Sequence, residues 1–263
     1  MQKLPAVLTI AGSDNSCGAG AQADLKTITS LGGYAQTAIT CVVAEVPGAV
    51  EMIQPVKAAV VEAQMRLSLQ AFPVGAIKTG MLFSPAIVRR VADTLRRLAP
   101  GTPLVVDPVM VASSGAPLLA PAAIAAYQTQ LFPMATLLTP NLDELRSLTG
   151  MPCSDHRQME EAARALVERY GCSVLAKGGH LGTKQAIDIL ITPESSERFT
   201  APFRRRVDTH GTGCTFAAAI ATGLAQGRSL SEAVARGKRF ITAAIEQRLT
   251  WGKTTALDHR VQV

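Results

Sequence analysis

The segment His210-Gly211-Thr212-Gly213-Cys214 offers the most specific chemistry in this sequence, because an apolar helical pattern follows it from Thr215 onward. Gly211 and Gly213 let the backbone fold closely around a ligand, and a helix that begins there points N–H groups and a partial positive charge outward. This arrangement suits a phosphoryl group whose charge spreads over several oxygens during transfer. The alternative is a glycine-rich turn that only redirects the chain.

Cys214 falls in the first turn of that predicted helix, where the pKa of a thiol is commonly lowered. It is therefore a candidate proton acceptor or nucleophile, with a buried structural cysteine as the alternative. The other cysteines lack this setting and are predicted to be structural: Cys17, which is the least clear because it lies in a candidate substrate loop, Cys41, Cys153 and Cys172. Five cysteines without paired spacing argue against a disulfide framework or a zinc finger and favour reduced thiols in a cytoplasm.

Oxygen-bearing side chains follow two other predicted strands. Asp107 ends the run Leu104 to Val106, and Asn141 and Glu144 stand three residues apart after another strand. If Asn141 begins a helix, Asn141 and Glu144 share one face and could present oxygen ligands to a hard cation such as Mg²⁺. The same spacing is that of a capping box, and Asp107 could be a turn residue, so both interpretations stay open.

Lys177 precedes two glycines at a further strand end, where its ammonium could reach a polyphosphate; a solvated surface lysine is the alternative. The loop from Gly12 to Gly20 matches neither a P-loop nor a dinucleotide-binding fingerprint. It could hold a small polar substrate through backbone groups and Asp14, or be a simple turn. We expect His210 to shape the anion-binding loop. The remaining histidines lack metal-ligand spacing: His156, His180 and His259.

Short β-rich runs alternate with longer amphipathic ones, which is typical of β-α units on a mostly parallel sheet. The predicted strands are Ala6–Ile10, Gln36–Ala44, Ala76–Lys78, Leu104–Asp107, Thr136–Thr139, Ser173–Ala176 and Ala186–Ile191. The predicted helices are Ala21–Leu31, Val56–Gln70, Pro85–Leu98, Pro121–Leu131, Met159–Tyr170, Gly213–Ala225 and Ser231–Gln247. Connections are short, so we predict one domain over residues 1–263. The carboxyl ends of its strands should bring the candidate residues to one edge.

The composition narrows the possible partners. Hydrophobic residues make up 48% and aromatic residues 4% of the 263 residues, which fits a buried globular core and excludes disorder. The net charge of +6 suits an anionic ligand but also an ordinary basic protein. The densest basic run, 204–206, has few aromatic neighbours, so no nucleic-acid partner is expected. No run approaches the roughly 18 apolar residues of a membrane helix, so no membrane partner is expected either.

Six motifs in order carry a family resemblance: Ala11–Lys26, Lys78–Met81, Asp107–Met110, Thr139–Asn141, Lys177–His180 and His210–Thr215. Together they resemble the hydroxymethylpyrimidine/phosphomethylpyrimidine kinases of thiamine biosynthesis, within the ribokinase-like superfamily. Pyridoxine and pyridoxal kinases share much of the pattern, which spans about Ala6 to Gln247. The resemblance implies a three-layer α/β/α sandwich, ATP with Mg²⁺, and a homodimer. It also implies phosphorylation of a hydroxymethyl group and then of the resulting monophosphate.

The resemblance further implies roles for individual residues. Cys214 would be the base that takes the hydroxyl proton, and the amides of Gly211, Thr212, Gly213 and Cys214 would form an anion hole. Asp107 and Glu144 would lie around Mg²⁺. The residues expected at ATP are Lys177, Asn141 and Thr212. The residues expected around the pyrimidine are Gly12, Asp14, Ala19, Glu45, Met81 and Val109.

One departure from the family concerns the substrate. Glu45 stands where the family usually has a glutamine that binds the pyrimidine. A glutamine amide both donates and accepts hydrogen bonds, whereas an ionised carboxylate only accepts them. Glu45 must therefore be protonated, face a protonated ring or serve another substrate, which keeps pyridoxine as an alternative acceptor. A relative that binds nucleotide without catalysis is a further alternative; the presence of Cys214 and Glu144 argues against it.

Overall fold

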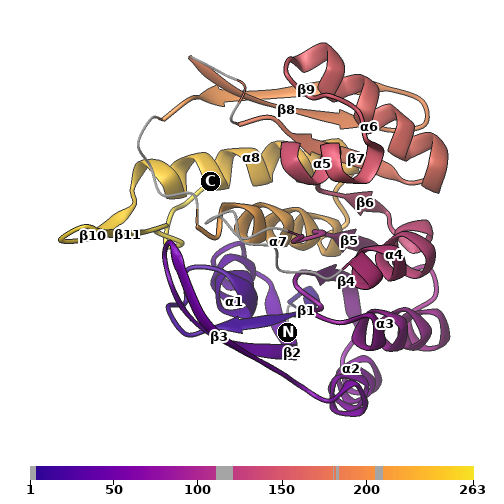
Figure 1. Cartoon of the computed structure of the whole chain (residues 1–263). Helices are drawn as coiled ribbons and strands as arrows, with labels where there is room; N and C mark the ends of the chain where they lie inside the picture. Colours follow the sequence, from indigo (N-terminus) through magenta and orange to yellow (C-terminus); the bar gives the residue numbers. More distant parts are fainter. Residues whose placement is uncertain (1–3, 111–120, 180, 182–183, 205–209) are drawn as a thin grey trace.

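The computed structural model describes residues 4–110, 121–179, 181, 184–204 and 210–263. A nine-stranded sheet with the order β3-β2-β1-β4-β5-β6-β7-β8-β9 runs through it (Figure 1). The strands are β1 (Ala6–Asp14), β2 (Tyr34–Val46), β3 (Ala49–Pro55), β4 (Val74–Thr79), β5 (Leu104–Val106), β6 (Leu137–Leu138), β7 (Ser173–Lys177), β8 (Gln185–Ile191) and β9 (Ser196–Pro202). Six neighbouring strands, β2-β1-β4-β5-β6-β7 in sheet order, pair in parallel. At one edge β3 pairs antiparallel with β2, and at the other β8 and β9 pair antiparallel.

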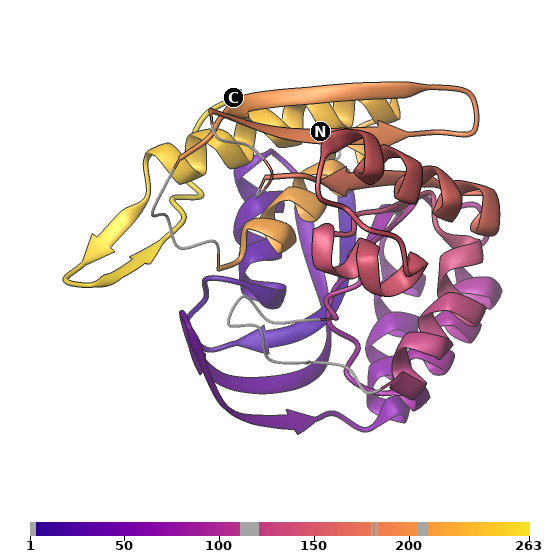
Figure 2. The same cartoon turned by 45° about the horizontal axis from the view of Figure 1, so that its top comes forward.

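Helices cover both faces of the sheet (Figure 2). One layer holds α1 (Gly20–Ser30), α7 (Thr212–Ala225) and α8 (Leu230–Glu246); the other holds α2 (Ala58–Ala71), α3 (Pro85–Leu98), α4 (Pro121–Ala126), α5 (Leu142–Thr149) and α6 (His156–Tyr170). Neighbouring strand residues serve opposite layers because side chains alternate across a strand. Val105 packs with α7 and α8, whereas Leu104 and Val106 pack with α3 to α6. This is the predicted three-layer α/β/α sandwich.

Helix α7 lies against the sheet on one side and α8 on the other, so its central residues, Thr215 to Gly223, are all buried. Small residues make this placement possible. A Cβ on Gly223 would lie 2.9 Å from the Cβ of Ala233 in α8, and one on Gly237 of α8 would lie 2.9 Å from the Phe216 ring. The close packing fixes the axis of α7, and with it the direction in which its N-terminus points.

The predicted strands and helices are all present, with ends shifted by a few residues. Four deviations stand out. The predicted helix Pro121–Leu131 becomes π-helical over Tyr127–Leu131 and ends in a 3₁₀ turn, Phe132–Met134. The sequence analysis missed β3 and β9, which are exposed edge strands without an apolar run. A small hairpin of β10 (Leu249–Trp251) and β11 (Thr254–Ala256) was also not predicted, and α5 was expected only on the condition that Asn141 begins a helix. Within the described ranges, no helix has both the length and the apolarity to cross a membrane.

Candidate active site

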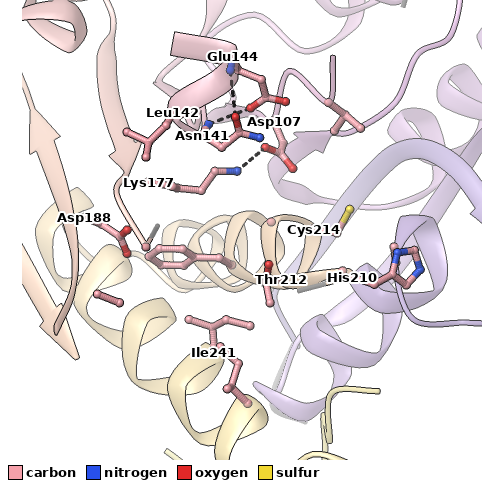
Figure 3. A pocket seen from close by; sticks show the side chains of 18 of the residues that line it. Asp107, Asn141, Leu142, Glu144, Lys177, Asp188, His210, Thr212, Cys214 and Ile241 are labelled. Carbon is pink, nitrogen blue, oxygen red and sulfur yellow. Dashed lines mark hydrogen bonds and ion pairs between the residues drawn. The ribbon is translucent and has the colours of Figure 1, made fainter. Parts of the chain in front are cut away.

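A cavity of about 570 Å³ lies at the carboxyl ends of β1, β4, β5 and β7, beside the N-terminus of α7. Every residue predicted for the site lines it: Gly12, Asp14, Ala19, Glu45, Met81, Asp107, Val109, Asn141, Glu144, Lys177, Gly211, Thr212, Gly213 and Cys214. Figure 3 shows Lys177 and Asp107 directed toward each other, with Cys214 and His210 along an adjoining wall. Segments distant in sequence therefore meet at one sheet edge, as the parallel topology requires.

The N-terminus of α7 depends on one glycine. Gly211 is the N-cap and has φ of 80°, a left-handed conformation that glycine adopts most readily. A Cβ at this position would lie 1.8 Å from the carbonyl oxygen of Gly18. The loop before α7 is thus pressed against the N-terminal loop. A Cβ on Gly213 would lie 3.2 Å from Lys177 Nζ and 3.4 Å from Asp107 Oδ2, so the first turn of α7 faces both charges.

Lys177 and Asp107 form an ion pair between the ends of β7 and β5. Lys177 Nζ lies 2.9 Å from Asp107 Oδ1, and Thr139 Oγ1 donates to the same oxygen at 3.0 Å. The Lys177 side chain is 15% exposed, so the alternative of a solvated surface lysine is wrong. Burial opposes its charge, but the carboxylates of Asp107 and Glu144 outweigh burial and raise the pKa of the ammonium. The site therefore holds a fixed cation beside the helix N-terminus.

Asn141 and Glu144 form the capping box that the sequence left as an alternative. Asn141 Oδ1 accepts the Glu144 N–H at 2.9 Å, and Glu144 Oε2 accepts the Asn141 N–H at 2.8 Å. Glu144 Oε1 also accepts the N–H of Met110, at 3.0 Å. Burial raises the pKa of Glu144, and Lys177 partly offsets that rise. The carboxyl group thus joins α5 to the segment after β5 while it lines the cavity.

The carboxyl groups of Asp107 and Glu144 fit a magnesium ion that arrives with a nucleotide. The negative charge of Asp107 disfavours ionisation of Glu144 and contributes to its raised pKa. A bound cation would relieve this repulsion. Mg²⁺ in kinase sites takes one or two protein carboxylates and completes its shell with phosphates and water. Among the described residues there is no group of three or more His, Cys, Asp or Glu placed to hold a metal ion by themselves.

Asp14 organises the N-terminal loop. Its carboxylate accepts the N–H groups of Ser16 at 2.7 Å, Gly18 at 3.1 Å and Ala19 at 2.7 Å, and it pairs with His210 Nε2 at 3.0 Å. Burial raises its pKa, but these hydrogen bonds, led by His210, prevail and lower the pKa to about 2. The bond to His210 joins this loop to the segment before α7. His210 thus fixes the position of the loop before α7, the loop for which the sequence predicts anion binding.

The expectation of a lowered Cys214 pKa is wrong. Burial raises the pKa of this thiol to about 11; Lys78 favours the thiolate, whereas Asp24 and Asp107 oppose it. The N-terminus of α7 does not compensate for the loss of water around the sulfur. Among the other cysteines, Cys41, Cys153 and Cys172 are buried as predicted, and all five are free of disulfides.

Sequence reasoning missed two further ion pairs near the site. Lys78 Nζ lies 2.9 and 2.8 Å from the two oxygens of Asp24, and both side chains are 0% exposed. A lysine inside the apolar run before Thr79 was the available signal. At the other end of the cavity, Lys238 Nζ lies 2.7 Å from Asp188 Oδ2, and Asp188 Oδ1 accepts the Gly178 N–H at 3.0 Å. This second pair braces the turn after Lys177.

The end of the cavity near Met81 is more apolar. Cys41, Val43 and Met81 form a cluster separate from the two main cores, with Phe83 and Val109 packed against it. Glu45 lies beside this cluster, and its N–H donates to Asn15 Oδ1 at 2.7 Å. Burial, followed by the charge of Asp14, raises the pKa of Glu45, and His210 lowers it. The pocket therefore makes ionisation of Glu45 less favourable than it is in water.

The doubly covered sheet, the glycine-capped helix N-terminus and the cation beside it define a ribokinase-like small-molecule kinase. The sequence model of the phosphomethylpyrimidine kinase family matches residues 14–257, so the chain belongs to this family. It is 43% identical to a hydroxymethylpyrimidine/phosphomethylpyrimidine kinase of Rhizobium meliloti, over 90% of this chain and 89% of the relative. It is 47% identical to the thiamine biosynthesis bifunctional protein ThiED of Geobacter sulfurreducens, over 91% of this chain and 49% of that protein, so the chain spans about half of ThiED.

Solved structures agree with this assignment. A pyridoxal kinase from Staphylococcus aureus in complex with AMP-PCP and pyridoxal has a TM-score of 0.89 and 34% identity, and the match covers 98% of this chain and 94% of that one. A phosphomethylpyrimidine kinase from Clostridium difficile has a TM-score of 0.82 and 35% identity, with 92% of this chain and 100% of that chain covered. The fold is therefore shared by kinases that differ in their acceptor.

Proposed function

We propose that this enzyme transfers the γ-phosphoryl group of ATP to the hydroxymethyl group of 4-amino-5-hydroxymethyl-2-methylpyrimidine and then to the monophosphate so formed. The observation that carries the proposal is the continuity of the cavity. One end has the α7 N-terminus and Lys177, which suit phosphates, and the other has the Met81 cluster, which suits a flat ring. Cys214 lies where the two ends meet. The names of its relatives at 40–47% identity support the same substrates.

In the proposed reaction the substrate hydroxyl oxygen forms a bond to the γ-phosphorus while the bond to the β-phosphate oxygen breaks. The hydroxyl proton passes to Cys214 in its thiolate form, which the raised pKa of this thiol makes a minor species before the substrates bind. Lys78 is the cation that favours this thiolate against the effect of burial. The N–H groups of Gly213 and Cys214, with the dipole of α7, neutralise the charge on the transferring group, and Thr212 contributes from the same turn. Positioning and charge neutralisation supply most of the catalysis in such reactions.

At the nucleotide end, Lys177 would contact the phosphates, and Asn141 would contribute from the start of α5. Asp107 and Glu144 would hold the Mg²⁺ that accompanies ATP, and this ion would neutralise phosphate charge. Lys177 already has a carboxylate partner in Asp107, so a phosphate and its Mg²⁺ would divide that pair between them. The change costs little because each charge exchanges one partner for another.

Glu45 is the residue that we assign to recognition of the acceptor ring. In its neutral form the carboxyl group donates to a ring nitrogen and accepts from the adjacent amino group, which is the pairing that a 4-aminopyrimidine needs. The raised pKa of Glu45 supports this form. Pyridoxine is the second candidate acceptor because the pyridoxal kinase from Staphylococcus aureus shares the fold so closely. An ionised Glu45 would suit the hydroxyl and protonated nitrogen of that ring.

The test is a steady-state comparison of the two alcohols with ATP and Mg²⁺. Coupled detection of ADP gives kcat/KM, and phosphorus NMR counts the phosphates on each product. We expect the larger kcat/KM for the hydroxymethylpyrimidine and a diphosphate as its final product. An equal or larger kcat/KM for pyridoxine would overturn the choice of substrate.

We also propose that the enzyme is a homodimer in the cytoplasm. Light scattering should then report a mass twice the 27.6 kDa of the chain.

A further inference from the structure

Backbone strain in this protein gathers around the acceptor end of the cavity. Three non-glycine residues in the described segments have left-handed φ values: Cys17 at 59°, Phe83 at 63° and Val109 at 44°. For a β-branched residue such as Val109 this conformation is a true outlier. Phe83 and Val109 both pack against the Met81 cluster. Such strain persists only where the surroundings hold the backbone in place, and it is concentrated at ligand sites.

The segment around Met81 is held by two buried hydroxyl groups. Tyr127 Oη donates to the carbonyl oxygen of Gly80 at 2.9 Å and accepts the N–H of Leu82 at 3.1 Å. The two bonds therefore fix the backbone immediately before and after Met81. A second side chain, Thr40, donates from Oγ1 to the Met81 carbonyl at 2.6 Å. Both contacts come from elements remote in sequence, so neither is available to the isolated loop.

The ring of Tyr127 is fixed independently of these hydrogen bonds. It is 1% exposed, and its centroid lies 5.9 Å from that of Phe132, which in turn lies 5.2 Å from Tyr170. Tyr127 also begins the π-helical turn Tyr127–Leu131, a type of turn often found at functional sites. The packing of the ring fixes the position of the Tyr127 hydroxyl, and the two hydrogen bonds of this hydroxyl fix the backbone of Gly80–Leu82.

We propose that Tyr127 is a positioning residue for the acceptor pocket: its hydroxyl holds the Gly80–Leu82 backbone so that Met81 presents its side chain to the acceptor ring. The identity of the acceptor rests on the proposed function, whereas the control of Met81 by Tyr127 does not. Because Tyr127 acts through Met81 and lines no part of the nucleotide end, its removal affects acceptor binding and leaves ATP binding unchanged.

The kinetic test uses Tyr127→Phe, which removes the hydroxyl and retains the ring. Leaving two buried backbone groups without their partner should raise KM for the acceptor by about five- to twentyfold, with kcat and KM for ATP within about twofold of wild type. Tyr170→Phe is the matched control, because it removes a hydroxyl from the same aromatic group without touching the loop, and it should change none of these values. Equal rises in both KM values, or an unchanged acceptor KM, would overturn the proposal.

A readout without substrate separates this proposal from the proposed function. In protein labelled with carbon-13 at the methionine methyl groups, the Met81 signal is assigned by its loss in Met81→Leu. We expect Tyr127→Phe to shift this signal and Tyr170→Phe to leave it in place. If neither alcohol is phosphorylated, the proposed function fails while a shifted Met81 signal still supports the positioning role. An unshifted Met81 signal in Tyr127→Phe contradicts it.

Thr40→Val is the second variant, should Tyr127→Phe fail to fold. It removes the hydroxyl that holds the Met81 carbonyl and retains the branched shape of the side chain. It should shift the same methyl signal and raise the acceptor KM in the same direction. Where both variants fold, their combination should raise KM by less than the product of the single effects, because both act on one loop. Unaltered Met81 signals in Thr40→Val would count against a loop held by buried hydroxyl groups.

Discussion

The two ends of the cavity are built by different means. The phosphate end uses short sequence features: a glycine N-cap, a capping box formed by residues three apart, and an ion pair between the ends of β5 and β7, which flank β6. The acceptor end combines strained backbone at Phe83 and Val109 with the segment Gly80–Leu82, which side chains from remote elements hold. The difference suggests that chemistry common to many kinases can reside in short motifs, whereas selection of the acceptor depends on tertiary contacts.

The largest effect is expected at the junction of the two ends. Cys214→Ala removes the proposed proton acceptor and should lower kcat by about two to four orders of magnitude, the usual range for a positioned base. The fall should be similar with every acceptor that the enzyme takes. Cys172→Ala removes another buried thiol, far from the cavity, and is the control. Steady-state rates with circular dichroism spectra would check this, and wild-type turnover of a folded Cys214→Ala protein would refute the role.

Substitutions of Lys78 and Lys177 should have different effects, the first mainly on stability and the second mainly on ATP binding. Lys78→Met leaves Asp24 buried without its partner and should reduce the free energy of unfolding by about 3–5 kcal/mol. Lys177→Met acts at the cavity surface and should raise KM for ATP about tenfold or more, with a smaller loss of stability and little change in the acceptor KM. Urea unfolding and steady-state kinetics measure the two quantities. Lys57→Met, at an exposed lysine, is the control.

If Lys177→Met raised the acceptor KM as much as the ATP KM, the division of the cavity into two ends would be wrong. A Lys78→Met protein as stable as wild type would show that the buried pair contributes no net stability. Only the first result would replace the comparison of two ends with a single site that binds both substrates.

The smallest effect concerns pH at the acceptor end. Burial raises the pKa of Glu45, and the proposed recognition needs its neutral form. KM for the hydroxymethylpyrimidine should therefore rise several-fold as pH increases through the Glu45 pKa and the carboxyl group becomes ionised. Glu45→Gln keeps a donor and an acceptor at all pH values, so its KM should lack this dependence. KM measured at several pH values for both proteins tests the idea, and parallel curves would exclude it.

The phosphate end of the cavity was easier to predict from the sequence than the acceptor end. Gly211, Lys177 and the Asn141–Glu144 spacing could be found from sequence, because glycines before a helix and residues at strand ends have local signals. The sign of the Cys214 pKa shift could not, since it depends on how much water the folded chain removes around the sulfur. Tyr127 also carried no signal: it reads as one residue in a continuous helix, and its function depends on a π-helical turn and on a loop 47 residues away in sequence.

The fold shows a similar limit. The buried parallel strands were predictable from apolar runs such as Leu104 to Val106. The edge strands β3 and β9 were missed because most of their residues are exposed, so their sequences contain no continuous apolar run. A missed edge strand matters here, since β3 pairs with the part of β2 that carries Glu45. Its absence from the prediction left the setting of Glu45 undefined.

The most direct test of the account is a crystal structure with a non-hydrolysable ATP analogue, Mg²⁺ and the hydroxymethylpyrimidine bound together. The account predicts the γ-phosphate against the N–H groups of the Gly211–Cys214 turn, with the acceptor hydroxyl between that phosphate and Cys214 Sγ. A γ-phosphate held elsewhere in the cavity, or an acceptor hydroxyl directed away from the sulfur, would contradict it.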